Sequence, residues 1–214
     1  MSLARVATRC RQGINASIVW VEAHLSPGLP TIALVGASAT VVKDAKERVR
    51  SAIISSGYRW PDARLTISFS PAGVPQATAS LDLPIAVAIL IASRQIPETL
   101  ADGAEFYGEL SLDGRILATS GLLAAGASQR EPSVTLITPS DNAPAIAALC
   151  DNVFGLANLG DLRAPHSWKR SVPQDDKSTS DGRIVSPTTA SGAARALASW
   201  RNSCDRRTSY VDVR

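Results

Sequence analysis

The sequence predicts an α/β fold of the α+β kind, in which helices pack on a mixed sheet. Stretches with the two-residue period of strands alternate along the chain with stretches of helical period. Hydrophobic residues make up 45% of the 214 residues and aromatic residues only 5%, which is typical of an aliphatic core. Residues 83–92 are apolar without interruption, so a helix formed there should be central in that core.

The first half of the chain predicts three strands and one amphipathic helix. Strands are expected over 14–25, over 31–35 after a Gly-Leu-Pro turn, and over 65–69, where apolar residues alternate with Thr and Ser. Between the last two, residues 38–55 have a helical period that ends at Ser56-Gly57. The apolar face of this helix consists of Val42, Ala45, Val49, Ala52 and Ile53.

The second half begins with the apolar helix, for which Asp82 supplies a capping carboxylate and Pro84 a residue suited to the first turn. A hairpin over 106–117 is expected to turn at the dipeptide Asp113-Gly114. An Ala-rich helix from Leu122, a strand over 134–137, a helix over 142–149 and a strand over 153–155 complete the predicted domain.

Charge and composition divide the chain at residue 162. Residues 1–162 hold 12 basic and 14 acidic side chains and form the predicted domain, whereas residues 163–214 hold 10 basic and 5 acidic ones. The second segment is rich in Pro, Ser, Thr and Asp, which is typical of a linker. We therefore expect an irregular, basic C-terminal tail. It is either a solvated linker or a segment that contacts nucleic acid phosphates.

Several chemistries lack the residues they need. The three cysteines, Cys10, Cys150 and Cys204, and the two histidines, His24 and His166, are widely spaced, so no metal site is expected. An odd number of cysteines without a disulfide framework suggests reduced thiols and a cytoplasmic location. No apolar run approaches the length of about 20 residues that a membrane span requires, so no membrane contact is expected.

Nucleotide and nucleophile motifs are also absent from the sequence. No GxxxxGK[ST] loop is present to hold phosphates, and no GxGxxG opens a helix after a strand. No GxSxG elbow supports a serine triad. The expectation is that this chain binds no cofactor of its own and is not an enzyme.

Three stretches taken together resemble the N-terminal domain of the magnesium-chelatase-like AAA+ ATPases of the ComM/YifB type. They are 28–36 with 42–53, 81–90, and 108–115 with 121–123, so the resemblance covers residues 1–162. It implies a fold similar to the Lon proteolytic domain, which is related to a ribosomal small-subunit fold. Members of this family continue into an AAA+ module and act as hexameric motors. With ATP and Mg, these motors promote branch migration of DNA in natural transformation.

The resemblance therefore implies a truncated competence protein or an excised domain, because residues 211–214 resemble the segment just before the AAA+ module. DNA, that AAA+ module and further copies of the chain are the partners it implies. Aligned with Lon, Ser80 takes the nucleophile position, and Leu123 stands where Lon-type enzymes have the lysine that accepts the serine proton. Leucine cannot accept a proton, so no catalytic residue is expected.

Basic residues on the helix over 38–55 are the candidate nucleic-acid contacts. Helical spacing brings Lys43, Lys46 and Arg50 near one another, although Asp44 and Glu47 are interleaved with them. They form either a solvated, ion-paired helix face or a face for DNA. The function expected is a non-catalytic accessory domain of a AAA+ motor acting on DNA. The alternatives are a residual Lon-like serine peptidase and a module that binds nucleic acid through its basic tail.

Overall fold

The computed structural model of the protein describes residues 1–13, 15–35, 39–71, 81–129 and 131–173. Its strands are β1 (Ser2–Gln12), β2 (Asn15–Ser26), β3 (Thr31–Val35), β4 (Arg64–Ser70), β5 (Ala104–Phe106), β6 (Glu109–Leu110), β7 (Ile116–Leu117), β8 (Thr135–Pro139) and β9 (Val153–Leu156). Its α-helices are α1 (Ala39–Ser55), α2 (Asp82–Ala92), α3 (Leu122–Ser128) and α4 (Ala143–Ala147). Short 3-10 helices are η2 (Glu98–Ala101), η3 (Leu159–Arg163) and η4 (Pro165–Ser167).

Seven strands of the described chain form one mixed sheet, in the order β3-β4-β2-β1-β5-β8-β9. The β1–β2 and β2–β4 pairs are antiparallel, and the other four neighbouring pairs are parallel. The two longest strands pair along their whole length, from Ser2 opposite Leu25 to Gln12 opposite Asn15. The expected mixed α/β architecture is thereby confirmed, with one addition: β1 was not among the predicted strands.

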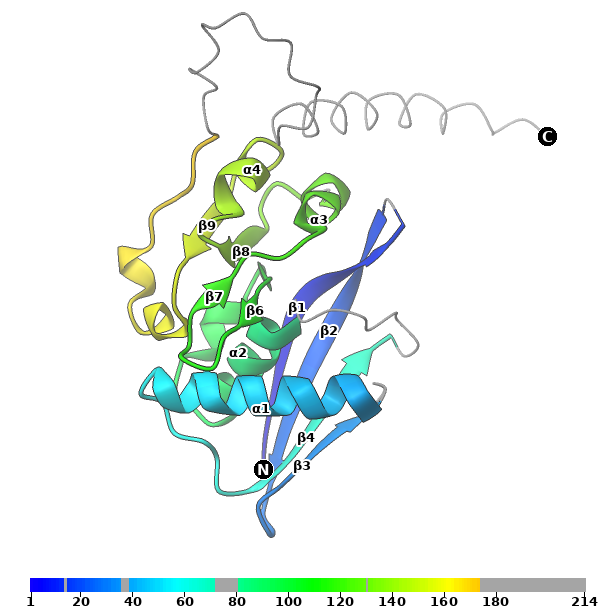
Figure 1. Ribbon diagram of the computed structural model, residues 1–214, viewed down its shortest axis with the longest axis vertical. Coiled ribbons are helices and arrows are strands. Elements are labelled where there is room, and N and C mark those ends of the chain that lie inside the picture. The colour runs from blue at the N-terminus through cyan, green and yellow to red at the C-terminus, as the bar shows by residue number, and fades with distance from the viewer. Residues whose placement is uncertain (14, 36–38, 72–80, 130, 174–214) are drawn as a thin grey trace, which may run out of the picture.

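The apolar helix α2 lies at the centre of the molecule, as its sequence predicts. All eleven of its residues are buried, because the sheet packs on one side of it and α1 on the other. Figure 1 shows α1 crossing in front of α2, with the strands behind. The inner face of α1 is the predicted one, since Ala45, Val49, Ala52 and Ile53 are each at most 5% exposed.

The hairpin of β6 and β7 turns differently from the expectation. Its strands pair Leu110 with Ile116, and the Ser111 N–H donates to the Arg115 carbonyl at 3.0 Å. The loop between them therefore has three residues, 112–114, rather than the predicted two. Gly114 has φ +89°, which suits the last residue of a three-residue hairpin loop. The hairpin tip contacts α1, since the Ser55 hydroxyl donates to the Leu112 carbonyl at 2.9 Å.

A second apolar cluster lies on the other face of the sheet, under α3 and α4 (Figure 1). Strand alternation separates the two clusters, because Phe106 and Ile137 belong to the main core whereas Tyr107 and Leu136 belong to the second. Both predicted Ala-rich helices are present and pack on this cluster, although the second is shorter than predicted, spanning Ala143–Ala147.

The chain after residue 162 continues to pack on the domain for several residues. The Trp168 indole N–H donates to the Asp161 carbonyl at 2.9 Å, and its ring lies 6.3 Å from that of Phe154. The Ser171 N–H then donates to the Val153 carbonyl at 2.7 Å, beside the β9 edge of the sheet. Most of the predicted basic tail, from residue 174 onward, lies outside the described residues.

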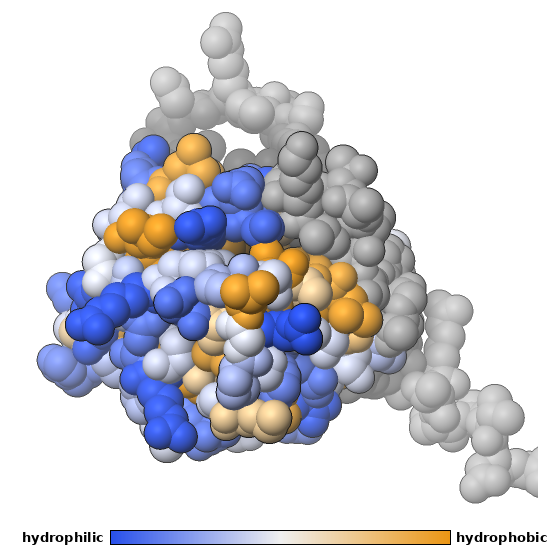
Figure 2. All heavy atoms as spheres, turned by 90° about the horizontal axis from the view of Figure 1, so that it is seen from below, coloured by the Kyte–Doolittle hydropathy of each residue, from blue (hydrophilic) through white to orange (hydrophobic). Residues whose placement is uncertain are grey.

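The three tryptophans of the described residues, Trp20, Trp60 and Trp168, are half-buried. Trp20 lies on β2, where the Arg5 guanidinium is 4.0 Å above its ring. Trp60 lies in the irregular segment before β4. Seen from below, hydrophilic side chains cover much of the described surface and hydrophobic ones form separate groups (Figure 2). None of the helices in the described ranges combines the length and apolar character that crossing a membrane requires.

Candidate nucleic-acid interface

The predicted basic residues lie on α1, and two of them line a hollow in the surface. Lys46 and Arg50 are one helical turn apart, with Lys46 half-buried and Arg50 exposed. The backbone of Lys43 belongs to the same helix, but its side chain lies outside the described part of the molecule. The hollow, here named the α1 hollow, has a volume of about 400 Å³. It is lined by Pro30, Thr31, Ile32, Lys46, Arg50, Trp60, Pro61 and Asp62.

An aromatic ring stands beside these cations. The Arg50 guanidinium carbon lies 5.8 Å from the centre of the Trp60 ring, which is within the range of a cation–π contact. Trp60 was not among the predicted site residues. Its place beside Arg50 depends on how the segment after α1 returns to the sheet, which spacing along the chain does not specify.

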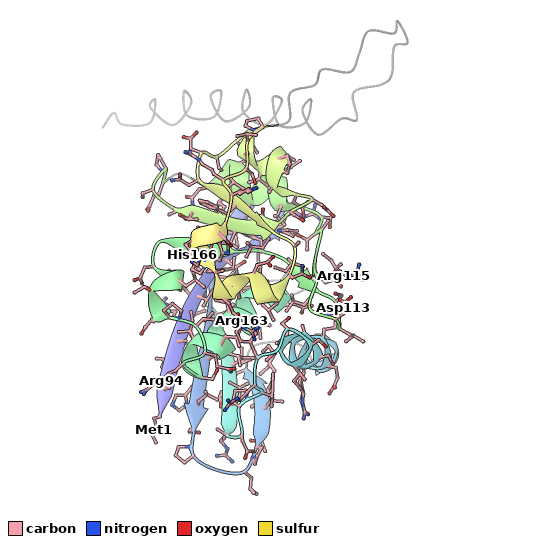
Figure 3. The ribbon with its side chains drawn as sticks, turned by 90° about the vertical axis from the view of Figure 1, so that its left-hand side faces the viewer. Met1, Arg94, Asp113, Arg115, Arg163 and His166 are labelled. Carbon is pink, nitrogen blue, oxygen red and sulfur yellow. The ribbon has the colours of Figure 1, made fainter. Side chains whose placement is uncertain are left out.

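A larger hollow also has Trp60 in its lining. This second hollow, here named the Arg163 hollow, has a volume of about 740 Å³, and its lining includes Tyr58, Arg59, Trp60, Gln95 and Arg163. The Arg163 guanidinium lies 4.2 Å over the Tyr58 ring. Figure 3 shows Arg163 near the middle of this side of the molecule, below His166. Arg59 and Arg163, both exposed, were not predicted as site residues.

Four cations of the two hollows form no ion pair with a carboxylate in the described structure. Its ion pairs belong to Arg5, Arg9, Arg48 and Arg115, and none includes Lys46, Arg50, Arg59 or Arg163. Asp62 is the acidic residue shared by the two linings. The interpretation of the α1 face as ion-paired is therefore not supported at Lys46 or Arg50, since neither forms a described ion pair. A basic surface without such pairs can bind phosphates.

The inner side of α1 carries a different basic residue, which is paired. The Arg48 guanidinium donates to the Asp82 carboxylate at the start of α2, through Nε at 2.7 Å and Nη2 at 3.1 Å. Asp82 also accepts the Leu110 N–H at 3.3 Å and is only 1% exposed. The helix-capping role expected for Asp82 is therefore wrong. Leu81 holds the N-cap position, and Asp82 lies inside the helix, where it joins α1, α2 and the hairpin.

Burial governs the protonation of this carboxyl. It raises the pKa of Asp82 to about 6, although Arg48 and the Leu110 N–H act in the opposite direction. The folded chain therefore holds a proton between about pH 4 and pH 6 that the unfolded chain releases. Stability must fall as the pH rises through this window and then level off above it.

We expect this pH dependence to disappear in Asp82→Asn, which cannot titrate. Across this window, the titration of Asp82 changes the free energy of unfolding by on the order of 3 kcal/mol at most, which follows from the difference between its pKa of about 6 and the ordinary value. Urea unfolding of wild type and variant from pH 4 to pH 8 measures it as the difference between the two curves. Parallel curves would show that Asp82 does not titrate in this range.

The positions compared with Lon do not form a described site. Ser80 lies outside the described residues. Leu123 lies on α3 and packs against the second apolar cluster, so its described contacts are those of a structural residue. Within the ranges that the structure describes, no group of three or more His, Cys, Asp or Glu could hold a metal ion.

Sequence reasoning missed a second buried polar group, at the β1–β5 pair. Glu105, 3% exposed, accepts Arg9 Nε at 3.0 Å and Nη2 at 2.9 Å, the Gln129 amide at 3.3 Å, and the Tyr107 hydroxyl. Burial and the neighbouring Glu105 carboxylate raise the pKa of Tyr107 well above its ordinary value. Each partner is satisfied inside the fold, so this group holds strands together and offers no open site.

Comparison with known proteins places this geometry in context. The family model of the ChlI subunit of magnesium chelatase matches residues 21–142. The uncharacterized protein YifB of Escherichia coli is 40% identical over 182 residues, which cover 82% of this chain and 36% of YifB. Competence protein ComM of Haemophilus influenzae is 36% identical over 163 residues, which cover 76% of this chain and 32% of ComM. An uncharacterized protein of Mycobacterium tuberculosis is 35% identical over 201 residues, which cover 92% of this chain and 38% of that protein. The chain thus spans about a third of the length of the curated relatives it matches.

Proposed function

Because the chain belongs to the magnesium-chelatase ChlI family, together with YifB and ComM, we propose that it is a non-catalytic accessory domain of a DNA-acting AAA+ motor. Its task is to guide DNA past the motor rather than to turn over a substrate. The observation that carries the proposal is the placement of Lys46 and Arg50. Both line a surface hollow beside Trp60 and have no carboxylate partner in the described structure.

The proposed division of labour leaves ATP and Mg to an AAA+ module outside these residues. The 214 residues contain no GxxxxGK[ST] loop, and Leu123 replaces the proton-accepting lysine that the Lon comparison requires. The relative from Haemophilus influenzae is named a competence protein. By analogy we propose a role in natural transformation and recombination, in a homo-oligomer formed with that module.

Neutralising the α1 face is expected to weaken DNA binding. In Lys46→Gln/Arg50→Gln the affinity of the 214-residue chain for DNA should fall about 10-fold at low salt, because two phosphate contacts are lost. The slope of log K against log salt should decrease by about 1.4 for a single strand and about 1.8 for a duplex. Fluorescence anisotropy with a labelled oligonucleotide in a salt series measures both.

The matched control replaces two exposed arginines that line neither hollow. Arg5 and Arg115 are 51% and 65% exposed at their side chains, and each has an acidic neighbour. The variant Arg5→Gln/Arg115→Gln changes the net charge by the same amount, so it should retain most of the affinity. Equal losses in both double variants would mean that only net charge matters, and the assignment of DNA binding to α1 would be wrong.

The absence of catalysis is a separate expectation. Isothermal titration with ATP should give no binding heat, and a fluorophosphonate probe should not label Ser80, since a serine without a base is a weak nucleophile. Labelling at Ser80 would favour the alternative of a residual peptidase. Tight ATP binding would contradict the assignment of nucleotide chemistry to another module.

A further inference from the structure

We infer that the α1 hollow and the Arg163 hollow form one track for single-stranded DNA, in which a base stacks on Trp60. This inference rests on the proposed function and specifies the form of DNA that the domain takes. It adds Trp60, Arg59 and Arg163 to the residues that touch the strand.

The two hollows share one wall. Trp60, Pro61 and Asp62 line both, so a ligand that runs from one hollow into the other passes the Trp60 side chain. Trp60 is half-buried and therefore keeps part of its ring accessible. The ring of Pro61 fixes the φ angle of that residue and so limits the freedom of this segment.

Cations line both of the hollows that Trp60 borders. Lys46 and Arg50 line the α1 hollow, and Arg59 and Arg163 line the Arg163 hollow. An aromatic side chain between cationic groups is the arrangement by which proteins bind single strands without reading their sequence: cations follow the phosphates, and bases stack on the rings. Asp62, which lines both hollows, offsets one of these positive charges, so the two linings together remain positively charged.

The dimensions and the chemistry favour a single strand over a duplex. Volumes of about 400 and 740 Å³ are in the range of pockets that enclose small organic molecules, so a few nucleotides fit where a double helix does not. In a duplex the base faces are covered by neighbouring bases, so that Trp60 would find only phosphates and base edges. A single strand offers both phosphates and open base faces.

The test compares two single strands that carry the same phosphates, and a duplex. The full 214-residue chain is titrated with an oligo(dT) of about 20 nucleotides, with an abasic oligonucleotide of equal length, and with a duplex of equal length. Wild type should bind oligo(dT) about 10-fold more tightly than the abasic strand, since one stacked base contributes a factor of this order. It should also prefer oligo(dT) to the duplex.

Substitutions at Trp60 then assign the preference to its ring. Trp60→Ala should abolish the difference between oligo(dT) and the abasic strand, whereas Trp60→Phe, which keeps a stacking surface, should retain most of it. Trp20→Ala is the matched control, because Trp20 is another half-buried tryptophan under an arginine. Trp20 pairs with Ser70 at the far end of β4, about 20 Å of strand from the β4 end nearest Trp60. Thermal melting checks that all variants fold.

The outcomes separate this inference from the proposed function. If wild type binds both strands equally and Lys46→Gln/Arg50→Gln still weakens binding, the domain binds DNA but the stacking track is wrong. If no DNA probe binds, the proposed function fails and the track fails with it. If a polyglutamate peptide competes with oligo(dT) as strongly as the abasic strand does, the hollows are a surface for acidic peptides and the inference is overturned.

Discussion

Replacing Arg48 by methionine is expected to lower the free energy of unfolding by about 3–5 kcal/mol at pH 8, because a buried carboxylate loses its counter-charge. Asp82 is 1% exposed, and the Arg48 guanidinium donates to both of its oxygens. Methionine keeps most of the apolar stem of arginine, so lost packing is a small part of the effect. Urea unfolding monitored by circular dichroism measures the change.

Two comparisons identify the buried charge as the cause. At pH 5 the loss in Arg48→Met should be smaller than at pH 8, since the Asp82 carboxyl, whose pKa burial already raises to about 6, then takes up a proton. The double variant Arg48→Met/Asp82→Asn should be more stable than Arg48→Met alone at pH 8. A loss that is the same at both pH values, with no recovery in the double variant, would assign the effect to packing.

A loss of similar size, about 3–5 kcal/mol, is expected for Glu105→Ala in the second buried polar group. Arg9, whose side chain is 15% exposed, and the buried Tyr107 hydroxyl would lose their shared acceptor. Because Glu105 is on β5 and Arg9 is on β1, the variant also weakens the junction between the two halves of the sheet. Chemical denaturation at neutral pH measures the change.

A more exposed pair on neighbouring strands, whose Glu22 also accepts the Ser68 hydroxyl at 3.1 Å, provides the control for this variant. Arg5 and Glu22 lie 3.6 Å apart on β1 and β2, with side chains 51% and 34% exposed. Exposed pairs contribute little, so Glu22→Ala should cost less than about 1 kcal/mol. Comparable losses for Glu22→Ala and Glu105→Ala would mean that burial does not distinguish the two pairs.

Hydrophobic periodicity was sufficient to predict most of the helices and strands of the fold. The uninterrupted apolar run of α2 predicted a helix buried on all sides, and the period of α1 predicted which side chains it buries. Strand β1 was missed because arginines are frequent in it. The signal was nevertheless present, since Ala4, Val6 and Cys10 are buried and alternate with outward-facing residues such as Arg5 and Arg11.

The polar contacts could not be predicted in the same way. Arg48 and Asp82 are 34 residues apart, and their pairing depends on how α1 crosses α2. Spacing along α1 did bring Lys46 and Arg50 together on one face, as expected for residues i and i+4. Trp60, Arg59 and Arg163 join them only because the segment after α1 and the η3 helix meet at the same surface, and neither meeting leaves a periodic pattern in the sequence.

Photo-crosslinking locates the DNA on the chain and so distinguishes a DNA contact within residues 1–162 from one on the basic tail. The 214-residue chain is irradiated with a single strand containing 5-iodouracil, which bonds to aromatic side chains stacked on it, and digested with trypsin. The adducts are then identified by mass spectrometry. We expect adducts in the tryptic peptide 60–64, which contains Trp60, and their loss in Trp60→Ala. Adducts confined to peptides from residues 174–214 would contradict this expectation and assign DNA binding to the basic tail.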